Sequence, residues 1–230
     1  MESLNYHARS IFPIMKDFEI SKTALAPHDR RQFLRGLTGV ALTLPLMDEL
    51  PAAAGKPRII LDPGHGGKDG GSYWYGVKEK DLTLDLAKRV SANLKKAGVP
   101  SLLTRSTDVY VELENRAKIA NDYEGSIFVS LHFNAHKDRS IRGIESFYYP
   151  GSQSGQRLAS VMQSELGRRI KTRNRGTKAN RLKVLQSTKG PAALVECGFI
   201  SNRWECDRCS AAWFRQVLSE EITEGIARFL

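Results

Sequence analysis

The feature that most constrains the fold of this chain is a regular alternation of two patterns between residue 59 and the C-terminus. Short apolar runs, rich in β-branched and aromatic residues, are typical of buried strands. Between them stand stretches whose apolar side chains recur at helical spacing. Strands that alternate with helices favour a mainly parallel sheet with helices on its faces. The sequence therefore predicts the α/β class: a single-domain sandwich in which helices flank a mainly parallel, mixed sheet.

The boundaries of these patterns place the individual strands and helices. The expected strands are 58–62, 101–105, 126–134, 143–149 and 192–199. The expected helices are 79–98, 112–123, 154–170 and 211–230. The strand at 143–149 alternates apolar with polar side chains, so it is expected at an edge of the sheet. In the second helix, Leu113, Ala117 and Ala120 are expected to face the core.

The first part of the chain is typical of an export signal. Arg30 and Arg31 precede Phe33 and a short, weakly apolar run, and small residues follow. This order resembles a cleavable twin-arginine export signal; the alternative is an ordinary basic patch before an amphipathic helix. The apolar run is too short to span a bilayer, so no stable membrane insertion is expected. We predict that residues 1–54 are a twin-arginine-type signal with an N-terminal extension, and that residues 55–230 form one periplasmic or otherwise extracytoplasmic domain.

The net charge of +10 belongs to residues 55–230, because residues 1–54 carry equal numbers of basic and acidic side chains. Such a charge favours a polyanionic partner, such as nucleic acid, an anionic membrane surface or an acidic polymer. Eight of the basic residues lie in 168–183, which has no acidic residue. This stretch is either a solvated surface loop or an electrostatic contact for an acidic polymer. Nucleic acid is not expected as a partner, because no recognition helix or base-stacking motif is present in the sequence.

The three cysteines, Cys197, Cys206 and Cys209, are an odd number and cannot all pair with one another. Cys206 and Cys209 stand as C-x-x-C, which suits a disulfide, half of a metal site or two free thiols. A four-ligand zinc site would need a second cysteine pair, which the sequence lacks. Because twin-arginine export moves folded proteins, we expect that no disulfide is required for folding. Cys197 is expected to fill the core.

A glycine-rich stretch, IILDPGHGGKDGG at 59–71, begins with the first strand. Its glycine spacing matches neither a dinucleotide-binding fingerprint nor a P-loop, so it does not favour a phosphate site. Glycines let the backbone turn sharply around His65 and let a ligand approach closely. A second histidine, His132, lies near the end of the strand at 126–134. Carboxyl ends of parallel strands share the edge of a sheet where ligands bind, so the two imidazoles are expected to meet there. The alternative is two ordinary histidines with structural hydrogen bonds.

Two glutamates are candidates to complete a metal site with these histidines. Glu79 stands at the start of the first predicted helix, and Glu196 lies in an apolar strand, where a carboxylate is costly unless it is paired or used. Two histidines and one carboxylate are a common catalytic zinc set, and a second carboxylate then serves as general base. The spacing does not tell which glutamate binds the metal, and Asp62 and Glu145 compete by position. Asp62 is also the candidate that would orient the ring of His65.

The order of motifs resembles that of the zinc-dependent N-acetylmuramoyl-L-alanine amidases, along nearly the whole of residues 55–230. The matching segments are IILDPGHGGKDGG, KEKDLTLDLAKRV, LLTRSTDVYVELENRAKIAN, FVSLHFNAH, RGIESFYY and LVECGFISN. The resemblance implies an α/β amidase fold with one Zn²⁺ per chain. It implies that His65, Glu79 and His132 bind the zinc. It also implies that Glu196 is the catalytic glutamate.

The implied reaction is hydrolysis of the amide bond between N-acetylmuramic acid and L-alanine in peptidoglycan. It releases stem peptides from glycan strands in cell-wall remodelling, daughter-cell separation or autolysis. Zinc activates a water molecule, and Glu196 takes the water's proton and returns it to the leaving nitrogen. The resemblance also places Arg175 and Asn180 near the substrate groove. Some relatives carry a helical insertion that plugs the site, for which 149–168 has no room.

Two other functions would use the same residues. A zinc peptidase that cuts within stem peptides would carry the same motifs, and a non-catalytic protein would bind peptidoglycan without cleaving it. The intact set of histidines and glutamates argues against the second, since binding alone does not need all of them. No separate wall-binding module is recognised, so targeting is expected to come from the domain itself or from another protein that localises or activates it. The chain is expected to be a monomer.

Overall fold

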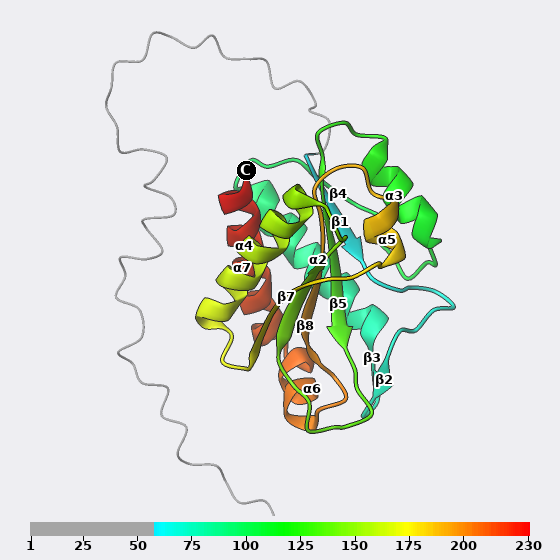
Figure 1. Cartoon of the computed structure of the whole chain (residues 1–230). Helices are drawn as coiled ribbons and strands as arrows, with labels where there is room; N and C mark the ends of the chain where they lie inside the picture. Colours follow the sequence, from blue (N-terminus) through cyan, green and yellow to red (C-terminus); the bar gives the residue numbers. More distant parts are fainter. Residues whose placement is uncertain (1–57) are drawn as a thin grey trace, which may run out of the picture. The chain divides into compact units, whose positions relative to one another are not determined.

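A six-stranded sheet lies at the centre of the residues that the computed structural model describes, 58–230 (Figure 1). The strand order is β4-β1-β5-β8-β6-β7. The strands are β1 (Ile59–Pro63), β4 (Ser101–Leu103), β5 (Ile127–Asn134), β6 (Ile144–Tyr148), β7 (Asn174–Ala179) and β8 (Ala192–Phe199). All neighbours in this sheet are parallel except β6 and β8, which confirms the predicted α/β class. The predicted export signal, residues 1–54, lies outside the described residues.

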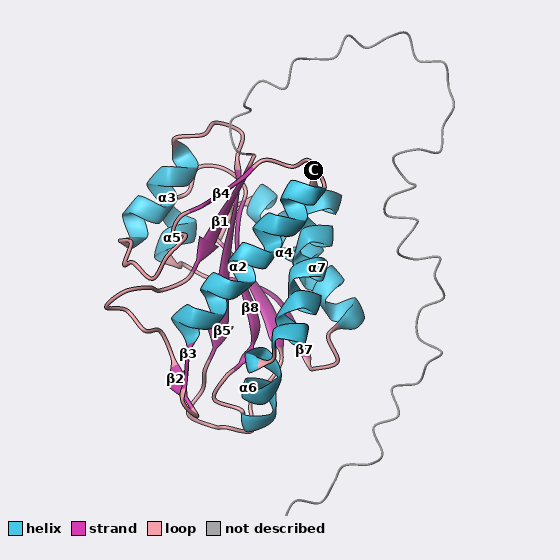
Figure 2. Ribbon diagram, turned by 180° about the vertical axis from the view of Figure 1, so that it is seen from behind, coloured by secondary structure: helices cyan, strands magenta, loops and turns pink. Residues whose placement is uncertain are grey.

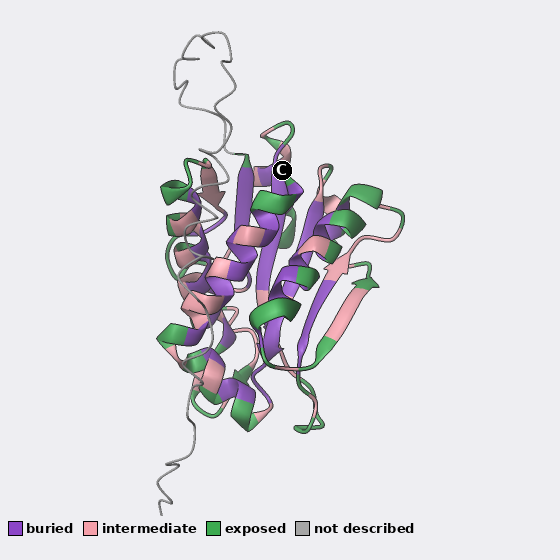
Figure 3. Ribbon diagram, turned by 90° about the vertical axis from the view of Figure 1, so that its left-hand side faces the viewer, coloured by how far each residue is buried: buried purple, intermediate pink, exposed green. Residues whose placement is uncertain are grey.

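One face of the sheet is covered by long helices (Figure 2). They are α2 (Glu79–Lys96), α4 (Gln153–Arg169) and α7 (Ala212–Phe229). Their apolar side chains form the larger core cluster with Leu61, Val129 and Val195 of the strands. Figure 3 shows buried residues concentrated in the strands and on the sides of the helices that face them. No described helix is long and apolar enough to cross a membrane.

The opposite face is covered by shorter helices, α3 (Leu113–Asn121) and α5 (Lys183–Ser187), which lie over one part of the sheet (Figure 1). A smaller apolar cluster lies under them and includes Ile60, Phe128 and Leu194. These two short helices therefore cover only the smaller apolar cluster. They leave the rest of this face without a helix.

The same, partly covered face carries the candidate site residues of the strands. Side chains that are two positions apart in a strand point to the same face of the sheet. Asp62, His132 and Glu196 therefore project on the same side as the smaller apolar cluster, since each lies an even number of residues from one of its members in the same strand. This places the candidate site on the partly covered face.

The strand at 143–149 is not at an edge of the sheet, so that prediction is wrong. β7 pairs in parallel with the outer side of β6 and is itself the edge strand. β7 comes from the basic stretch 168–183, which the sequence predicts to be a surface loop or a contact surface. Its residues, NRGTKA, are half-exposed or exposed, so no apolar alternation marks them as a strand. Basic side chains on an edge strand also discourage pairing with another chain.

Leu113 is a second correction. It is the first residue of α3, and its relative exposure is 46%. Ala117 and Ala120 of the same helix are buried, as predicted. Instead of packing in the core, Leu113 lines an open groove together with Leu182, Val184 and Leu194.

Besides β7 and α5, two further elements have no counterpart in the predicted pattern. A hairpin of β2 (Tyr73–Trp74) and β3 (Val77–Lys78) leads directly into α2, and its turn residues, Tyr75 and Gly76, both have positive φ angles. Such a two-residue turn matches the twist of paired strands. The other element is α6 (Arg203–Ser210), which follows β8 and carries two of the three cysteines. All three cysteines are buried and unpaired, and Cys197 lies in the larger core cluster, as predicted.

Candidate metal centre

The candidate site lies at the carboxyl ends of β1 and β5, which run side by side in parallel. Pro63 ends β1 and is level with Leu131 of β5. His65 comes two residues after Pro63, and His132 comes directly after Leu131. The ring centroids of the two histidines are 4.9 Å apart. The prediction that the two imidazoles meet at one edge of the sheet is confirmed.

Glu79, the first residue of α2, reaches both histidines. Its Oε1 atom lies 3.1 Å from Nε2 of His65 and 2.9 Å from Nδ1 of His132. One ligand atom from each of the three residues lies within 4.8 Å of the others. Zinc at about 2.0–2.1 Å from each of three tetrahedral ligands needs ligand atoms roughly 3.3 Å apart. The donor set therefore fits a zinc ion in both chemistry and size.

The Glu79 carboxylate is held in place by backbone amides. The N–H of Ser72 donates to Oε2 at 2.9 Å, and the N–H of Phe133 donates to Oε1 at 3.1 Å. Burial by itself would raise the pKa of Glu79, but the hydrogen bonds with His132 and His65 outweigh it and hold the pKa well below its usual value. Glu79 is therefore an anion, which is the form that a metal ligand requires.

Asp69 orients the ring of His65. Its Oδ2 atom lies 2.8 Å from Nδ1 of His65, while Nε2 of the same ring faces Glu79. A carboxylate on the outer nitrogen of a metal-binding histidine fixes the tautomer and the ring orientation. Burial lowers the pKa of His65, but Glu79 and Asp69 outweigh burial and raise it. Sequence reasoning missed Asp69, although its place four residues after His65 in the glycine-rich loop was a usable signal.

Asp62 does not contact the His65 ring, so that prediction is wrong. Its buried carboxylate accepts hydrogen bonds from Thr104 and Arg116 at Oδ1 and from Ser130 at Oδ2. The reason is that Asp62 is still inside β1, where its side chain meets the buried Arg116 and balances its charge. Arg116 in turn donates to the backbone carbonyl of His65 at 2.7 Å. Asp62 thus supports the loop through Arg116.

A second buried arginine, Arg105, holds the same loop by its backbone. It donates to the carbonyl oxygens of Pro63, Gly64 and Lys80 at 2.8–3.0 Å. These bonds secure the turn in which His65 has a φ angle of 63°, an uncommon value for a residue other than glycine. Arg105 lies in the segment LLTRSTDVYVELENRAKIAN that resembles the amidases, but the sequence did not indicate that it holds this loop.

Two glycines of the loop leave room for the metal-facing side chains. A Cβ atom on Gly64 would lie 2.2 Å from Cε1 of His132. A Cβ atom on Gly71 would lie 2.6 Å from Cδ2 of His65 and 2.7 Å from Oε2 of Glu79, and Gly71 also has a positive φ angle. Any larger residue at either position would displace the cluster. This confirms that the glycines make room for His65.

Glu196 lies beside the cluster. In β8 it is level with His132 of β5 and with Glu145 of β6. Its Oε2 atom is buried and has no hydrogen-bond partner among the described residues. Burial, followed by the negative charges of Glu79 and Glu145, raises the pKa of Glu196 well above its usual value. A carboxyl group with a raised pKa and an unoccupied oxygen is suited to accept and return a proton.

Glu145, a competing candidate, is satisfied by its neighbours. Asn134 donates to its Oε1 at 2.8 Å, Arg175 donates to its Oε2 at 3.1 Å, and Lys178 forms an ion pair with it. A carboxylate with these partners is less suited to proton transfer than that of Glu196. Glu145 instead places two cations beside the uncovered face of the sheet.

The predicted substrate residues Arg175 and Asn180 lie in β7 and directly after it. The Arg175 guanidinium is paired with Glu145 and lies 5.2 Å from the ring centroid of Phe199. The backbone N–H of Asn180 donates to the carbonyl oxygen of Tyr148, and the residue is exposed. Neither side chain belongs to the metal-facing cluster, and their contact with substrate stays a prediction.

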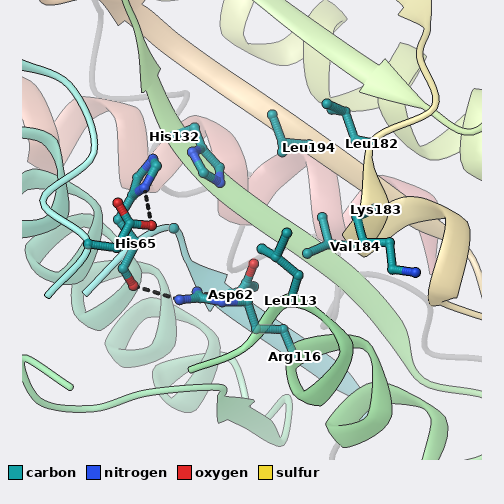
Figure 4. Close-up of a pocket in the computed structure, with 11 residues that line it drawn as sticks. Asp62, His65, Leu113, Arg116, His132, Leu182, Lys183, Val184 and Leu194 are labelled. Carbon is teal, nitrogen blue, oxygen red and sulfur yellow. Dashed lines mark hydrogen bonds and ion pairs between the residues drawn. The ribbon is translucent and has the colours of Figure 1, made fainter. Parts of the chain in front are cut away.

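A groove of about 160 Å³ leads away from the two histidines (Figure 4). Asp62 and Arg116 lie along it, and aliphatic side chains line its other end. The arrangement therefore joins a metal-ligand set, an unpartnered carboxyl group nearby and an apolar groove. Such a site can bind a hydrolytic metal and hold a substrate beside it.

Comparison with known proteins agrees with this geometry. A family model described as N-acetylmuramoyl-L-alanine amidase matches residues 59–228. The N-acetylmuramoyl-L-alanine amidase LytC of Bacillus subtilis is 34% identical over 174 residues, which are 74% of this chain and 35% of LytC. The chain thus spans about a third of the length of that relative.

Two solved structures share the fold. The N-acetylmuramoyl-L-alanine amidase AmiC2 of Nostoc punctiforme has a TM-score of 0.72 and 37% identity, over 76% of this chain and 97% of that chain. The CwlD amidase from Clostridioides difficile, solved in complex with the GerS lipoprotein, has a TM-score of 0.71 and 31% identity, over 74% of this chain and 96% of that chain. Each match covers nearly all of the solved chain, so this chain shares the whole fold of those two amidases.

Proposed function

The chain belongs to the N-acetylmuramoyl-L-alanine amidase family, and from this premise we propose that it hydrolyses the amide bond between N-acetylmuramic acid and L-alanine in peptidoglycan. The reaction would release stem peptides from glycan strands in cell-wall remodelling, daughter-cell separation or autolysis. One observation carries the proposal. His65, Glu79 and His132 form a metal-ligand set beside the unpartnered carboxyl group of Glu196. Binding alone requires neither feature.

In this proposal, His65, Glu79 and His132 hold one zinc ion per chain. When bound, zinc lowers the pKa of a water molecule and polarises the scissile carbonyl group. Asp69 keeps the Nε2 atom of His65 directed toward Glu79. The backbone amide of Phe133 holds the Oε1 atom of Glu79. These contacts set the ligands in place before a metal binds.

Glu196 moves the proton in the proposed reaction. Its Oε2 atom takes a proton from the attacking water and gives it to the nitrogen of the leaving L-alanine. Burial beside Glu79 and Glu145 raises the pKa of Glu196, so its carboxylate is a stronger base than that of an exposed glutamate. The resemblance to the family supports Arg175 and Asn180 as substrate contacts beside this group.

The proposed substrate also sets where the protein acts. Peptidoglycan lies outside the cytoplasm, so the chain is proposed to be periplasmic or otherwise extracytoplasmic, exported by the twin-arginine-type signal in residues 1–54. The CwlD amidase is known in complex with a lipoprotein, and this supports a localising or activating protein as a partner here. The chain is proposed to act as a monomer.

Digestion of purified sacculi tests the proposal. The expected products are soluble peptides that begin with L-alanine, together with glycan strands that remain intact. Fragments cut within the stem peptide would identify a zinc peptidase, and an absence of released peptide would identify a non-catalytic binder. A chelator should stop the reaction, and added zinc should restore it.

Two variants separate the roles of metal and base. Glu196→Gln should retain zinc and lose at least about 100-fold in turnover, because no side chain remains to accept the proton. His65→Ala should lose zinc itself. Metal analysis of both purified proteins, alongside the sacculus assay, distinguishes the two outcomes. Full activity of Glu196→Gln would overturn the assignment of Glu196.

A further inference from the structure

Three segments meet at the end of the sheet where β1, β5 and β8 end: the β2–β3 hairpin, the loop between β5 and β6, and α6 with the residues before it (Figure 1). The hydroxyl of Tyr75 donates to the carbonyl oxygen of Ser201 at 3.1 Å, and the N–H of His136 donates to the Ser201 hydroxyl at 2.9 Å. The side-chain amide of Asn202 donates to the carbonyl oxygen of Arg139 at 2.8 Å. These bonds join the three segments into one surface.

Four arginines on this surface are each stacked over an aromatic ring, with the guanidinium carbon 4.4–5.4 Å from the ring centroid. The pairs are Arg139–Trp74, Arg142–Trp204, Arg203–Tyr75 and Arg208–Trp204. Stacking uses the face of a guanidinium and leaves its N–H edge free for hydrogen bonds. A guanidinium that is already held in this way loses less conformational freedom when it binds an anion. We call these four residues the arginine surface.

Two of the four guanidiniums are free to bind an anion from outside the protein. Arg203 pairs with Asp207, and Arg208 donates to a backbone carbonyl oxygen. Arg139 and Arg142 are exposed, and neither guanidinium has a carboxylate or carbonyl partner among the described residues. Both come from the loop between β5 and β6 and lie three positions apart. This loop therefore presents two held, unpaired cations to the solvent.

The one acidic side chain of this loop does not pair with either arginine. The Oδ1 atom of Asp138 accepts hydrogen bonds from the backbone N–H of Ser140 at 2.9 Å and from its hydroxyl at 2.7 Å. Lys137 beside it adds a further exposed positive charge. The loop as a whole is therefore attractive to an anion.

The arginine surface is continuous with the candidate site. The guanidinium of Arg175, which pairs with Glu145, also donates to the carbonyl oxygen of Arg142 at 3.5 Å. Glu145 is in turn level with Glu196 in the neighbouring strand. A polymer held at Glu196 therefore needs to extend only past Glu145 and Arg175 to reach Arg142.

We propose that Arg139 and Arg142 bind carboxylate groups of peptidoglycan away from the cleaved bond, and so hold the polymer beside the candidate site. The inference rests on the proposed amidase function, which makes peptidoglycan the substrate, and adds to it a binding surface outside the metal-ligand residues. A planar carboxylate accepts two parallel hydrogen bonds from one guanidinium edge, which matches the groups that these arginines leave free. The position of the surface favours this polyanion over an anionic membrane, because the surface adjoins the site that would cleave the polymer.

Binding to purified sacculi tests the proposal in the Glu196→Gln protein, which should leave the polymer uncut. Adding Arg139→Gln and Arg142→Gln should weaken binding about tenfold in 0.05 M salt, roughly threefold for each exposed ion pair that is lost. In 0.5 M salt the two proteins should differ by less than about twofold, since ions screen exposed pairs. Pelleting of sacculi with bound protein measures both differences. Unchanged binding in 0.05 M salt would overturn the proposal.

The matched control is the pair Arg58→Gln and Arg157→Gln in the same background, which removes the same charge from another part of the molecule. Both arginines are exposed, and Arg157 is also stacked, over the ring of Phe229. Arg58 directly precedes β1, and Phe229 lies near the C-terminus, at the opposite end of the sheet from α6 (Figure 1). This pair should change sacculus binding by less than about twofold. Equal losses in the two double variants would show that binding follows net charge alone, contrary to the proposal.

Chemical treatment of the sacculi identifies the group that is bound. Coupling their carboxylates to ethanolamine with a carbodiimide turns them into neutral amides. The arginine substitutions should then weaken binding by less than about twofold, because the partner of both side chains is already lost. An undiminished tenfold effect on treated sacculi would rule out carboxylates as the ligand. Equal weakening on vesicles of phosphatidylglycerol and phosphatidylcholine would assign the surface to a membrane instead.

Failure of this inference and failure of the amidase function give different results. If the wild-type protein releases no peptide from sacculi while binding still depends on Arg139 and Arg142, the amidase function fails and the surface assignment stands. If the wild-type protein releases stem peptides but the arginine substitutions leave sacculus binding unchanged, the surface assignment fails and the amidase function stands.

Discussion

At the candidate site, the partners of each carboxylate determine what that carboxylate can do. Glu79 is held by two histidines and two backbone amides, and Glu145 is held by an amide side chain and two cations. The Oε2 atom of Glu196 has no partner among the described residues. A satisfied buried carboxylate serves as a ligand or a structural anchor, whereas an unsatisfied one costs stability and is available for chemistry.

Asp69 and Asp62 provide a contrast between a metal-orienting carboxylate and a structural one. Asp69→Asn should weaken zinc binding about 10- to 100-fold with little loss of stability, because Asp69 is partly exposed and holds the His65 ring. Asp62→Asn should instead lower the free energy of unfolding by about 3–5 kcal/mol, because it leaves the buried charge of Arg116 unbalanced. Chelator competition measures the first quantity, and urea unfolding of the metal-free protein measures the second. If both variants weakened zinc binding equally and neither lowered the free energy of unfolding, the two aspartates would not have these separate roles.

Glu196 should make the stability of the metal-free protein depend on pH. Its pKa is raised in the folded state, so its contribution to stability is complete below the unfolded pKa, near 4.3, and is lost as pH rises through the folded pKa. Glu196→Gln removes this loss. The difference in unfolding free energy between the variant and the wild type should grow in favour of the variant by at least about 1 kcal/mol when the pH rises from 5 to 8. Urea unfolding of both proteins with chelator at the two pH values measures the gain, and a pH-independent difference would refute it.

At the scale of elements, α6 joins the ends of the strands that carry Glu145 and Glu196. Its residue Glu205 accepts hydrogen bonds from the N–H of Gly143, directly before β6, and from the N–H of Phe199, the last residue of β8. The hydroxyl of Thr172, shortly before β7, also donates to it. One buried carboxylate thus links three adjacent segments beyond the candidate site.

Glu205→Ala should therefore lower the free energy of unfolding by about 2–4 kcal/mol, since it leaves buried donors without an acceptor. Asp207→Ala on the same helix is the control. Asp207 is 59% exposed in its side chain and pairs with Arg203, so its loss should cost under about 1 kcal/mol. Urea unfolding compares the two, and similar losses would show that Glu205 is not the anchor.

At the scale of the whole molecule, the two faces of the sheet have different tasks. Long helices cover one face and form the larger core cluster with it. The other face is only partly covered, and it carries the polar site. Residues 55–230 carry a net charge of +10. A cationic protein is attracted to a polymer that carries carboxylates, as peptidoglycan does.

Binding to whole sacculi should consequently depend on salt. The Glu196→Gln protein should bind sacculi about tenfold more weakly in 0.5 M than in 0.05 M salt, because ions screen the attraction between exposed charges. Pelleting of sacculi with bound protein measures this change. Binding of a small muramoyl dipeptide should change much less, since it carries far fewer charges than a sacculus. Equal salt dependence of the two ligands would contradict the separation.

The sequence by itself determined the class of fold and the residues that come together at the site. Periodicity and strand-end motifs are local properties, so they can be read along the chain without knowing which segments pair. His65 and His132 were singled out in this way, the resemblance to the amidases added Glu79, and the structure brings the three together. Cys197 was likewise placed in the core.

Only the tertiary structure decided which neighbours these residues have. Asp69 rather than Asp62 contacts His65, because the loop turns back on itself while Asp62 remains inside β1 and pairs with Arg116. The polar segment β7 covers the edge of β6 through backbone hydrogen bonds, which leave no apolar pattern in the sequence. Leu113 lines a groove with Leu182, Val184 and Leu194, which come from segments far along the chain. Such contacts join segments distant in the chain, and their geometry exists only once the chain has folded.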